Sequence, residues 1–406
     1  MMRLILAILA CLYLPNSLHG QDLIVYGETV HTMAGDAISD GYVRIRNGKI
    51  VEVGPSADCK PMGDEKIVRS TIITPGLVDA RTCVGLAGHF NTDHDRDELD
   101  ESSPVQPQLR AIDAFNSRER LIEWVREFGV TTIHTGHAPQ ALIPGQTMVI
   151  KTKGNRVEED VIIPMAMVAC SMSDTALRDD SPGTRAKASA MLRQKLLDAR
   201  HYQEQQSKYI TMDGETDLPR RDLEMEAFSS VLSGDTPLLV HAHRARDIAN
   251  ALRLQEEFGI PVVLDGASEA YLMMDDIKES GVPVFIHPTM IRPYGEQENL
   301  SFETASKLID AGIPVAMQSG YESYVPRTRI VLYEAGMAAA NGCSFDDALA
   351  MITIVPARIL GIDDRVGSLE VGKDADLALY DGDPFEWTTH CTGVIIDGEV
   401  ASTQLR

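Results

Sequence analysis

The chain has 406 residues, enough for a large α/β barrel with an appendage or for two medium-sized domains. Hydrophobic residues make up 44% and charged residues 24%, with 31 Gly and 20 Pro, a composition that excludes disordered, collagen-like and membrane proteins. The 60 acidic residues outnumber the 37 basic ones, and the formal charge of −23 would repel nucleic-acid phosphates and anionic lipids, so nucleic acid is excluded as a partner.

The first 20 residues have the pattern of a signal peptide. Arg3 precedes an apolar run over residues 4–14, and a short polar stretch follows before Gln21. This run is shorter than the roughly 20 residues that a membrane-spanning helix needs, and no later segment of the sequence reaches that length. We therefore expect removal of residues 1–20 and export to a periplasm or the extracellular space, with lipid attachment at Cys11 as the alternative.

The cysteines lie far apart and lack the CxxC pairs of zinc ribbons and the density of disulfide scaffolds. There are six of them: Cys11, Cys59, Cys83, Cys170, Cys343 and Cys391. Isolated buried thiols are the favoured interpretation. A disulfide between Cys59 and Cys391 is the alternative that an exporting compartment allows.

Short strands are predicted at both ends of the mature chain. Near the N-terminus they cover residues 23–26, 30–32, 42–46 and 49–53, and near the C-terminus residues 376–380 and 393–400. Asn47-Gly48 and Asp397-Gly398 have the composition of tight hairpin turns. Together the two ends predict one small β-sandwich domain formed by residues 21–74 and 362–406.

Between these ends, buried strands alternate with amphipathic helices. Strands are predicted at 130–134, 237–243, 260–265, 282–287 and 313–318, and helices at 118–128, 245–258, 270–280 and 302–311. Repeated βα units indicate a parallel sheet, either closed as a barrel or open and doubly wound. Because the sequence has no Gly-rich phosphate loop, we favour an α/β fold with a (β/α)8 TIM-like barrel over residues 75–361.

Acidic, turn-rich segments interrupt the barrel at residues 94–107, at 174–182 and within 203–221. Loops that follow barrel strands build the active site, so these segments are expected to cover the functional face and to set substrate choice. His89 and His94 lie at the first segment among aspartates, which indicates a solvated acidic face, with an ion site as the alternative.

Two motifs at the ends of the barrel carry a family resemblance. Residues 74–80 read Thr-Pro-Gly-Leu-Val-Asp-Ala, and residues 366–377 read Val-Gly-Ser-Leu-Glu-Val-Gly-Lys-Asp-Ala-Asp-Leu. They resemble the start of the first barrel strand and the return from barrel to β-sandwich in the amidohydrolase superfamily. With Thr-Ile-Val-Pro-Ala-Arg at 353–358, in a helix predicted at 344–361, the mature chain resembles the imidazolonepropionase-like branch.

The resemblance implies a hydrolase with one or two divalent metals at the C-terminal ends of the barrel strands. The metal would lower the pKa of a bound water to about 7, and an Asp on strand eight would accept its proton. Several ligand positions, however, carry other residues. Arg81 and Cys83 replace the first-strand His-x-His, and the strand-six His and strand-eight Asp positions fall at Gly266 and near Gly320.

One metal-ligand position keeps the histidine of the family, and this leaves two interpretations of whether the site binds a metal. His241 stands at the strand-five position, with His243 on the same face of the strand, and no lysine occurs at 165–169, where strand four of bimetallic relatives has one. In one interpretation Cys83, His241 and His243 hold a single transition metal such as zinc. In the other the two histidines bond to neighbouring groups in an inherited pocket and no metal binds.

Catalytic and substrate-binding roles are assigned to residues near the vacated positions. Glu322, Glu269 and Asp265 are the acids that could act as general base, and Glu322 is the one we select. Arg81 is expected to bind a substrate carboxylate. Three further residues are predicted at the rim of the substrate site, with surface solubility or a barrel-core role as the alternative: Arg327, Arg329 and His287.

Two functions from different classes are open at this point. The first is a hydrolase of non-peptide carbon–nitrogen bonds in a small substrate, such as a cyclic amide or a modified amino acid. The second is a catalytically inactive binding protein or partner subunit that recognises a small anion. A homo-oligomer is a further expectation, because amidohydrolase relatives often assemble.

Overall fold

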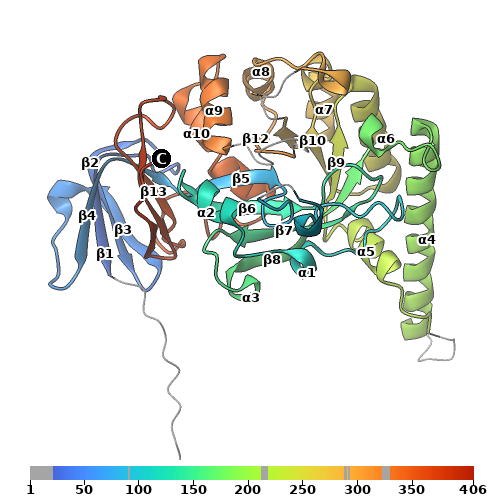
Figure 1. Ribbon diagram of the computed structural model, residues 1–406, viewed down its shortest axis with the longest axis horizontal. Helices are drawn as coiled ribbons and strands as arrows, with labels where there is room; N and C mark the ends of the chain where they lie inside the picture. Colours follow the sequence, from blue (N-terminus) through green and yellow to red (C-terminus); the bar gives the residue numbers. More distant parts are fainter. Residues whose placement is uncertain (1–21, 90–91, 212–217, 288–289, 291–292, 322–329) are drawn as a thin grey trace, which may run out of the picture.

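The computed structural model describes residues 22–89, 92–211, 218–287, 290, 293–321 and 330–406 (Figure 1). The predicted signal peptide, the expected start at Gln21 and Cys11 lie outside these residues. Among the helices of the described part, none is long and apolar enough to cross a membrane.

A seven-stranded sheet joins the two ends of the chain. Its strands run in the order β15-β14-β13-β4-β1-β2-β3. They are β1 (Leu23–Val30), β2 (Ile38–Arg46), β3 (Lys49–Pro55), β4 (Lys66–Pro75), β13 (Leu377–Tyr380), β14 (Cys391–Ile396) and β15 (Glu399–Ser402). The joint is the antiparallel pairing of β13 with β4, where Leu377 lies opposite Pro75. A small β domain shared by the two chain ends is therefore confirmed.

Both predicted hairpin turns have backbone angles that explain their sequences. Asn47 and Gly48 have φ values of 49° and 77°, and Asp397 and Gly398 have φ values of 49° and 74°. Positive φ at both central residues defines the tight turn that matches the twist of a hairpin, and Asn, Asp and Gly tolerate it best. These turns connect β2 to β3 and β14 to β15.

An eight-stranded sheet forms the second body, in the order β12-β11-β10-β9-β8-β7-β6-β5. Its strands are β5 (Leu77–Thr82), β6 (Val130–Gly136), β7 (Gly145–Lys151), β8 (Val161–Ser171), β9 (Leu238–Ala242), β10 (Val262–Gly266), β11 (Val284–Ile286) and β12 (Val315–Met317). Thr82 forms a parallel bridge with Gly320, and the Gly320 N–H donates to the carbonyl of Arg81 at 2.9 Å. This contact joins the two edge strands and closes the predicted barrel.

One barrel strand runs against the predicted direction. β7 pairs antiparallel with both β6 and β8, while the other neighbouring strands are parallel. Residues 137–144 link β6 to β7, too few for the crossover that a parallel pair requires. The expectation of a wholly parallel barrel is therefore wrong at this one strand.

The helices cover the outside of the barrel (Figure 1). The α-helices are α1 (Ala111–Ala114), α2 (Arg120–Arg126), α3 (Val157–Asp160), α4 (Arg185–Thr211), α5 (Leu223–Leu232), α6 (Ala245–Phe258), α7 (Met274–Ser280), α8 (Thr304–Asp310), α9 (Val331–Ala340), α10 (Phe345–Ala350) and α11 (Ile354–Ile359). Short 3-10 helices are η1 (Ser56–Asp58), η2 (Asp93–Asp95), η3 (Asp174–Ala176), η4 (Ala270–Leu272) and η5 (Gly295–Gln297). The single helix predicted at 344–361 is divided into α10 and α11, because Thr353 has φ −137° and ψ −90°, outside the helical region.

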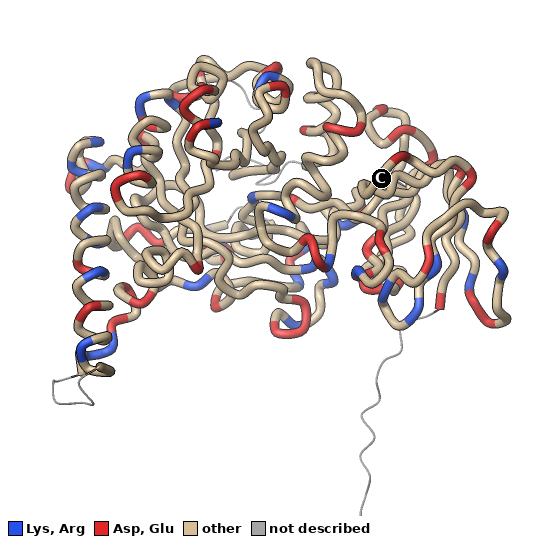
Figure 2. Tube along the Cα trace, turned by 180° about the vertical axis from the view of Figure 1, so that it is seen from behind, with Lys and Arg blue, Asp and Glu red and all other residues tan. Residues whose placement is uncertain are grey.

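Acidic and basic residues are interspersed over the described trace. Figure 2 shows both basic and acidic residues along the outer helices, with more basic ones on the long helix α4.

The barrel interior is filled by one apolar layer. It consists of Val78, Ala80, Val149, Met167, Leu239, Val263, Phe285 and Ala316, and residues of α11 and the segment after it pack against this layer. Side chains along a strand alternate between its two faces, so the residue two positions further on points into the barrel again. The layer therefore sets where the next interior side chains lie, at the C-terminal ends of the strands.

A buried ion cluster ties the barrel to the β domain. The Nζ atom of Lys151, at the end of β7, lies 2.8 Å from Asp374 and 3.1 Å from Asp376, and it also contacts Asp397. Burial alone would lower the pKa of Lys151, but the three aspartates raise it above its usual value. The aspartates of the Lys-Asp-Ala-Asp motif thus have a structural function at this junction.

The five cysteines of the described part are all free thiols. The Cys59 sulfur accepts a hydrogen bond from the Tyr26 hydroxyl at 3.1 Å, and the Cys391 thiol donates to the Gly393 carbonyl at 3.6 Å. The alternative of a Cys59–Cys391 disulfide is therefore not what the structure shows.

Candidate functional site

A polar group lies directly above the apolar layer, at the C-terminal ends of β9, β10 and β12. Leu239, Val263 and Ala316 belong to the layer, and the residue two positions after each is polar: His241, Asp265 and Gln318. Side chains two positions apart point to the same face of a strand, so the polar residues face the barrel interior like the apolar residues before them.

His241 and Asp265 form a hydrogen-bonded pair. The Nδ1 atom of His241 lies 2.9 Å from Oδ2 of Asp265, and Gln318 Nε2 donates to Oδ1 of the same carboxylate at 2.7 Å. An ionised carboxylate only accepts, so Nδ1 of His241 carries the proton and Nε2 has the lone pair. The His241 side chain is 15% exposed and that of Asp265 only 3%, so the imidazole is the partner that solvent reaches.

The Asp265 carboxylate is kept ionised by its neighbours. Burial by itself would raise the pKa of Asp265, but His241, the Arg81 guanidinium and the Gln318 amide together hold it well below its usual range. The pair is therefore an imidazole beside an ionised carboxylate, the arrangement that orients a histidine for proton transfer.

His243 lies beside His241 but has both ring nitrogens engaged. The two ring centroids are 4.6 Å apart and nearly perpendicular. Nδ1 of His243 is 2.8 Å from the Ser268 hydroxyl, and Nε2 is 3.2 Å from the Gln297 amide nitrogen. Burial, with His241 and His287 as neighbours, lowers the pKa of His243 well below its usual value, so the ring is neutral.

Arg81 is buried and bonded to backbone carbonyls. Its guanidinium donates to the carbonyls of Thr82 at 2.6 Å, Gly136 at 3.2 Å and His137. Its Nε atom is buried without a hydrogen-bond partner. The predicted contact with a substrate carboxylate stays a prediction, and three backbone contacts already use most of the donors.

Cys83 is buried in a small apolar cluster with Ala87 and Ala138. Burial raises the pKa of its thiol to about 12, although the Arg81 charge acts in the opposite direction. The thiol is therefore protonated near neutral pH, and a thiolate is the form that binds metal.

Gly266 occupies the position of the strand-six His ligand, and neighbouring side chains fill the space beside it. A Cβ atom at Gly266 would lie 2.7 Å from Cε1 of His243 and 3.2 Å from Cε1 of His241, and φ is +85°. The two imidazoles occupy the space that a side chain here would need. Gly320, at the strand-eight position, pairs with Thr82 where the barrel closes.

The remaining predicted residues have mixed outcomes. Glu269 accepts from the Ala245 N–H at 2.7 Å and from Asn299 at 2.8 Å, so it caps α6. His287 is fully buried at the end of β11, and its backbone N–H donates to the Gly266 carbonyl at 2.7 Å. His89 and His94 are exposed.

Three candidates lie outside the described residues, so their catalytic and substrate-binding roles stay predictions: Glu322, Arg327 and Arg329.

A segment after β11, which we call the strap (residues 294–299, containing η5), crosses the ends of β8 to β10. Its Glu296 accepts from the Ser173 hydroxyl at 2.7 Å, from the Asp174 N–H at 2.8 Å and from the Arg185 guanidinium. Gln297 of the strap contacts His243. Sequence reasoning missed Gln297 because it lies in a polar loop without periodicity, whereas strand alternation would have identified Gln318.

Comparisons with known proteins agree with this arrangement. A model of the family described as "Amidohydrolase family" matches residues 282–401. A solved amidohydrolase from Thermotoga maritima MSB8 is 29% identical, with a TM-score of 0.87, over 94% of this chain and 100% of that one. The chain belongs to the amidohydrolase superfamily.

Curated relatives refine the position within the superfamily. Imidazolonepropionase from Streptococcus pyogenes is 22% identical over 401 residues, 89% of this chain and 90% of that protein. Amidohydrolase tasK from Hapsidospora irregularis is 24% identical over 391 residues, but the chain covers only 39% of that protein's length. A zinc-bound adenosine deaminase from Xanthomonas campestris is 17% identical with a TM-score of 0.55, a likeness of fold. The predicted imidazolonepropionase-like branch is thus confirmed, and the chain is an amidohydrolase-family hydrolase.

The side chains at the mouth do not fit the metal that is typical of amidohydrolases. A guanidinium cannot ligate, and Gly266 has no side chain. Both nitrogens of His243 have partners. Within the described ranges, no three His, Cys, Asp or Glu side chains are arranged to hold a metal ion.

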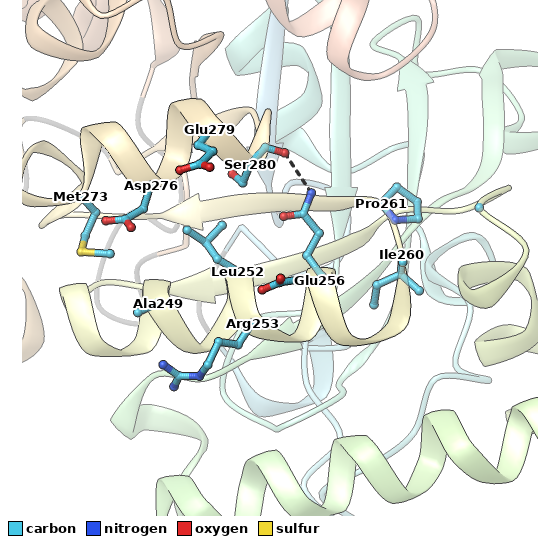
Figure 3. Close-up of a pocket in the computed structure, with 13 residues that line it drawn as sticks. Ala249, Leu252, Arg253, Glu256, Ile260, Pro261, Met273, Asp276, Glu279 and Ser280 are labelled. Atoms are coloured by element: carbon cyan, nitrogen blue, oxygen red, sulfur yellow. Dashed lines mark hydrogen bonds between the residues drawn. The ribbon is translucent and has the colours of Figure 1, made fainter.

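A described cavity lies elsewhere, on the outer surface between α6 and α7 (Figure 3). Its volume is about 900 Å³, and its lining includes Glu256, Asp276 and Glu279. Ile260 and Pro261, which also line it, precede β10, so the cavity is near the N-terminal end of that strand. None of the predicted site residues lines it, and active sites of such barrels lie at the opposite, C-terminal face.

Proposed function

We propose that the protein hydrolyses a non-peptide carbon–nitrogen bond of a small substrate at the C-terminal mouth of its barrel. The observation that carries this proposal is the 2.9 Å contact between His241 Nδ1 and Asp265 Oδ2, with the imidazole on the solvent side. Such a pair fixes the tautomer and the orientation of a histidine that acts as general base.

The proposed reaction uses proton transfer at Nε2 of His241. This nitrogen removes a proton from a water molecule, and the resulting hydroxide adds to the carbonyl carbon of the substrate. The tetrahedral intermediate then breaks its carbon–nitrogen bond while the imidazolium returns the proton to the departing nitrogen. The products are a carboxylic acid and an amine, and the charge of Asp265 stabilises the transient imidazolium.

The surroundings of the pair favour a small substrate. The strap passes over the ends of β9 and β10 and contacts His243, and Glu296 fixes it to the loop after β8. Side chains of the strap therefore limit the space above His241. A cyclic amide or a small modified amino acid suits such a site better than a polymer does.

The names of the relatives support the same bond class. The curated relatives are called amidohydrolase and imidazolonepropionase. We also propose export, on the strength of the signal-peptide pattern in residues 1–20, so the substrate would be met outside the cytoplasm. The second hypothesis, an inactive binding protein, has no observation in its favour.

A substrate panel with two histidine variants tests the proposal. The purified mature chain is incubated with imidazolones, hydantoins, lactams and N-acyl amino acids, and addition of one water is followed by mass spectrometry. We expect hydrolysis of at least one cyclic amide, and His241→Ala should lower kcat/KM by about 100-fold or more. His201→Ala, at an exposed histidine of α4, is the control and should retain full activity. Equal rates in wild type and His241→Ala would refute the assignment.

A further inference from the structure

Arg81 stands where the superfamily has a metal ligand, at the end of the first barrel strand. Its side chain is buried, with 3% exposure, and its guanidinium reaches the carbonyls of Thr82, Gly136 and His137. Thr82 ends β5 and Gly136 ends β6, so one cation links the C-terminal ends of two neighbouring strands.

The charge of Arg81 acts on several buried titratable side chains. It contributes to the lowered pKa of Asp265, His134 and His137, and it opposes the rise in pKa that burial causes at Asp79 and Cys83. A guanidinium cannot lose its proton in a protein, so this positive charge is permanent. The mouth therefore contains a fixed cation that does not depend on metal supply.

We propose that Arg81 is an internal cation that replaces the metal: it ties the ends of β5 and β6 together, places a permanent positive charge near Asp265, and excludes a divalent ion. This inference concerns the cation of the site and stands whether or not the proposed hydrolysis is correct.

The exclusion follows from charge and from donor chemistry. A divalent ion at the mouth would be repelled by the neighbouring guanidinium, and the repulsion is strong where water is scarce. Nor would the ion find a set of ligands among the described residues, because both nitrogens of His243 are engaged and Nε2 of His241 is then a single donor without two further ligand side chains beside it.

Metal content and thermal stability of the wild-type chain give the first test. The full mature chain is incubated with zinc or manganese, passed through a desalting column and analysed by elemental mass spectrometry. We expect less than about 0.1 metal ion per chain and no rise in Tm. Stoichiometric zinc that raises Tm and is lost in His241→Ala would overturn the proposal.

Chemical rescue gives the second test. Arg81→Ala should lower Tm by about 5 °C or more, because three buried carbonyls lose their donor. Millimolar guanidinium chloride should restore part of this loss, whereas sodium chloride at the same concentration should not. Arg110→Ala, at an arginine whose side chain is 52% exposed, is the matched control and should show neither loss nor rescue.

Both tests have outcomes that count against the idea. An Arg81→Ala variant as stable as Arg110→Ala, or one that guanidinium does not restore, would contradict a structural cation. If Arg81→Ala cannot be purified, Arg81→Lys replaces it, since Lys keeps the charge but loses the planar fork. We then expect a smaller Tm loss and still no zinc uptake. None of these readouts uses catalytic activity, so failure of the proposed function would leave them interpretable.

Discussion

Nδ1 of His241 lies 2.9 Å from Oδ2 of Asp265, and this contact joins the ends of β9 and β10. The two residues face each other in the parallel register of these strands. Gln318, which directly follows β12, donates to the second carboxylate oxygen. The carboxylate is thus fixed from two sides, and its orientation fixes the imidazole.

Asp265→Asn should therefore impair the site without unfolding it. An amide in place of the carboxylate can donate to Nδ1, which would shift the proton of His241 to Nε2 and remove the proposed base. We expect kcat to fall by about 100-fold or more with little change in KM, and nitrogen NMR of labelled histidine should show the change of tautomer. Asp276→Asn, at an exposed aspartate of α7, is the control. An unchanged His241 tautomer in Asp265→Asn would contradict the pairing.

Gly266→Ala tests whether the two imidazoles fill the vacated ligand position. The added methyl would lie 2.7 Å from His243 Cε1, in a backbone conformation with φ +85°. Strain and collision should together destabilise the fold by about 2–4 kcal/mol, measured by denaturant unfolding. Gly281→Ala has a similar φ of +70° with nothing within 4 Å, so it should show the backbone strain alone. Equal losses in the two variants would mean that the space beside the histidines is free.

Lys151→Met should destabilise the chain strongly. The variant would leave the buried Asp376 without its cation, beside an Asp374 that keeps only Lys49 and Arg365, a change that costs about 3–5 kcal/mol. Lys153→Met is the matched control, because Lys153 contacts only the outer carboxylate of this cluster, Asp397, and is 22% exposed. We expect a loss below about 1 kcal/mol there. Similar unfolding midpoints for the two variants would rule out a structural role of the cluster.

The same cluster should give acid sensitivity. Burial would raise the pKa of Asp374, but Lys151, Lys49 and Arg365 lower it to about 2. A carboxyl whose folded pKa is depressed stabilises the fold above its unfolded pKa, and that stabilisation is lost as the pH falls toward 2. Wild type should therefore lose stability between about pH 4 and pH 2, and Lys151→Met should lose less over this window in thermal unfolding scans.

Asp79 should act in the opposite direction. Burial raises the pKa of Asp79 to about 7, although Ser319 and Arg81 oppose the rise. The folded state then binds the proton more tightly than the unfolded state, so stability falls as the pH rises from about 4 to 7. Asp79→Asn should remove this slope and raise Tm more at pH 8 than at pH 5. Asp113→Asn, at a side chain 66% exposed, should change neither value. A wild-type Tm that does not fall across this range would contradict a raised pKa.

The sequence by itself determined the architecture. Period-two and helical patterns predicted the strands around β9 to β12 and the helices between them, and α6 has the predicted bounds, 245–258. The turn residues Asn47-Gly48 and Asp397-Gly398 defined the hairpins, since only a few residue types accept positive φ. The loss of the metal ligands could also be read from residue types alone, because Arg and Gly cannot coordinate.

Only the tertiary structure decided what replaces those ligands. His241 and Asp265 are 24 residues apart, and nothing local indicates that β9 and β10 bring them together. The antiparallel course of β7, the strap contact of Gln297 and the carbonyl contacts of Arg81 depend equally on distant segments. The physical reason is that hydrogen bonds and burial act through space, whereas a sequence pattern records which face of an element is buried and not which group lies opposite.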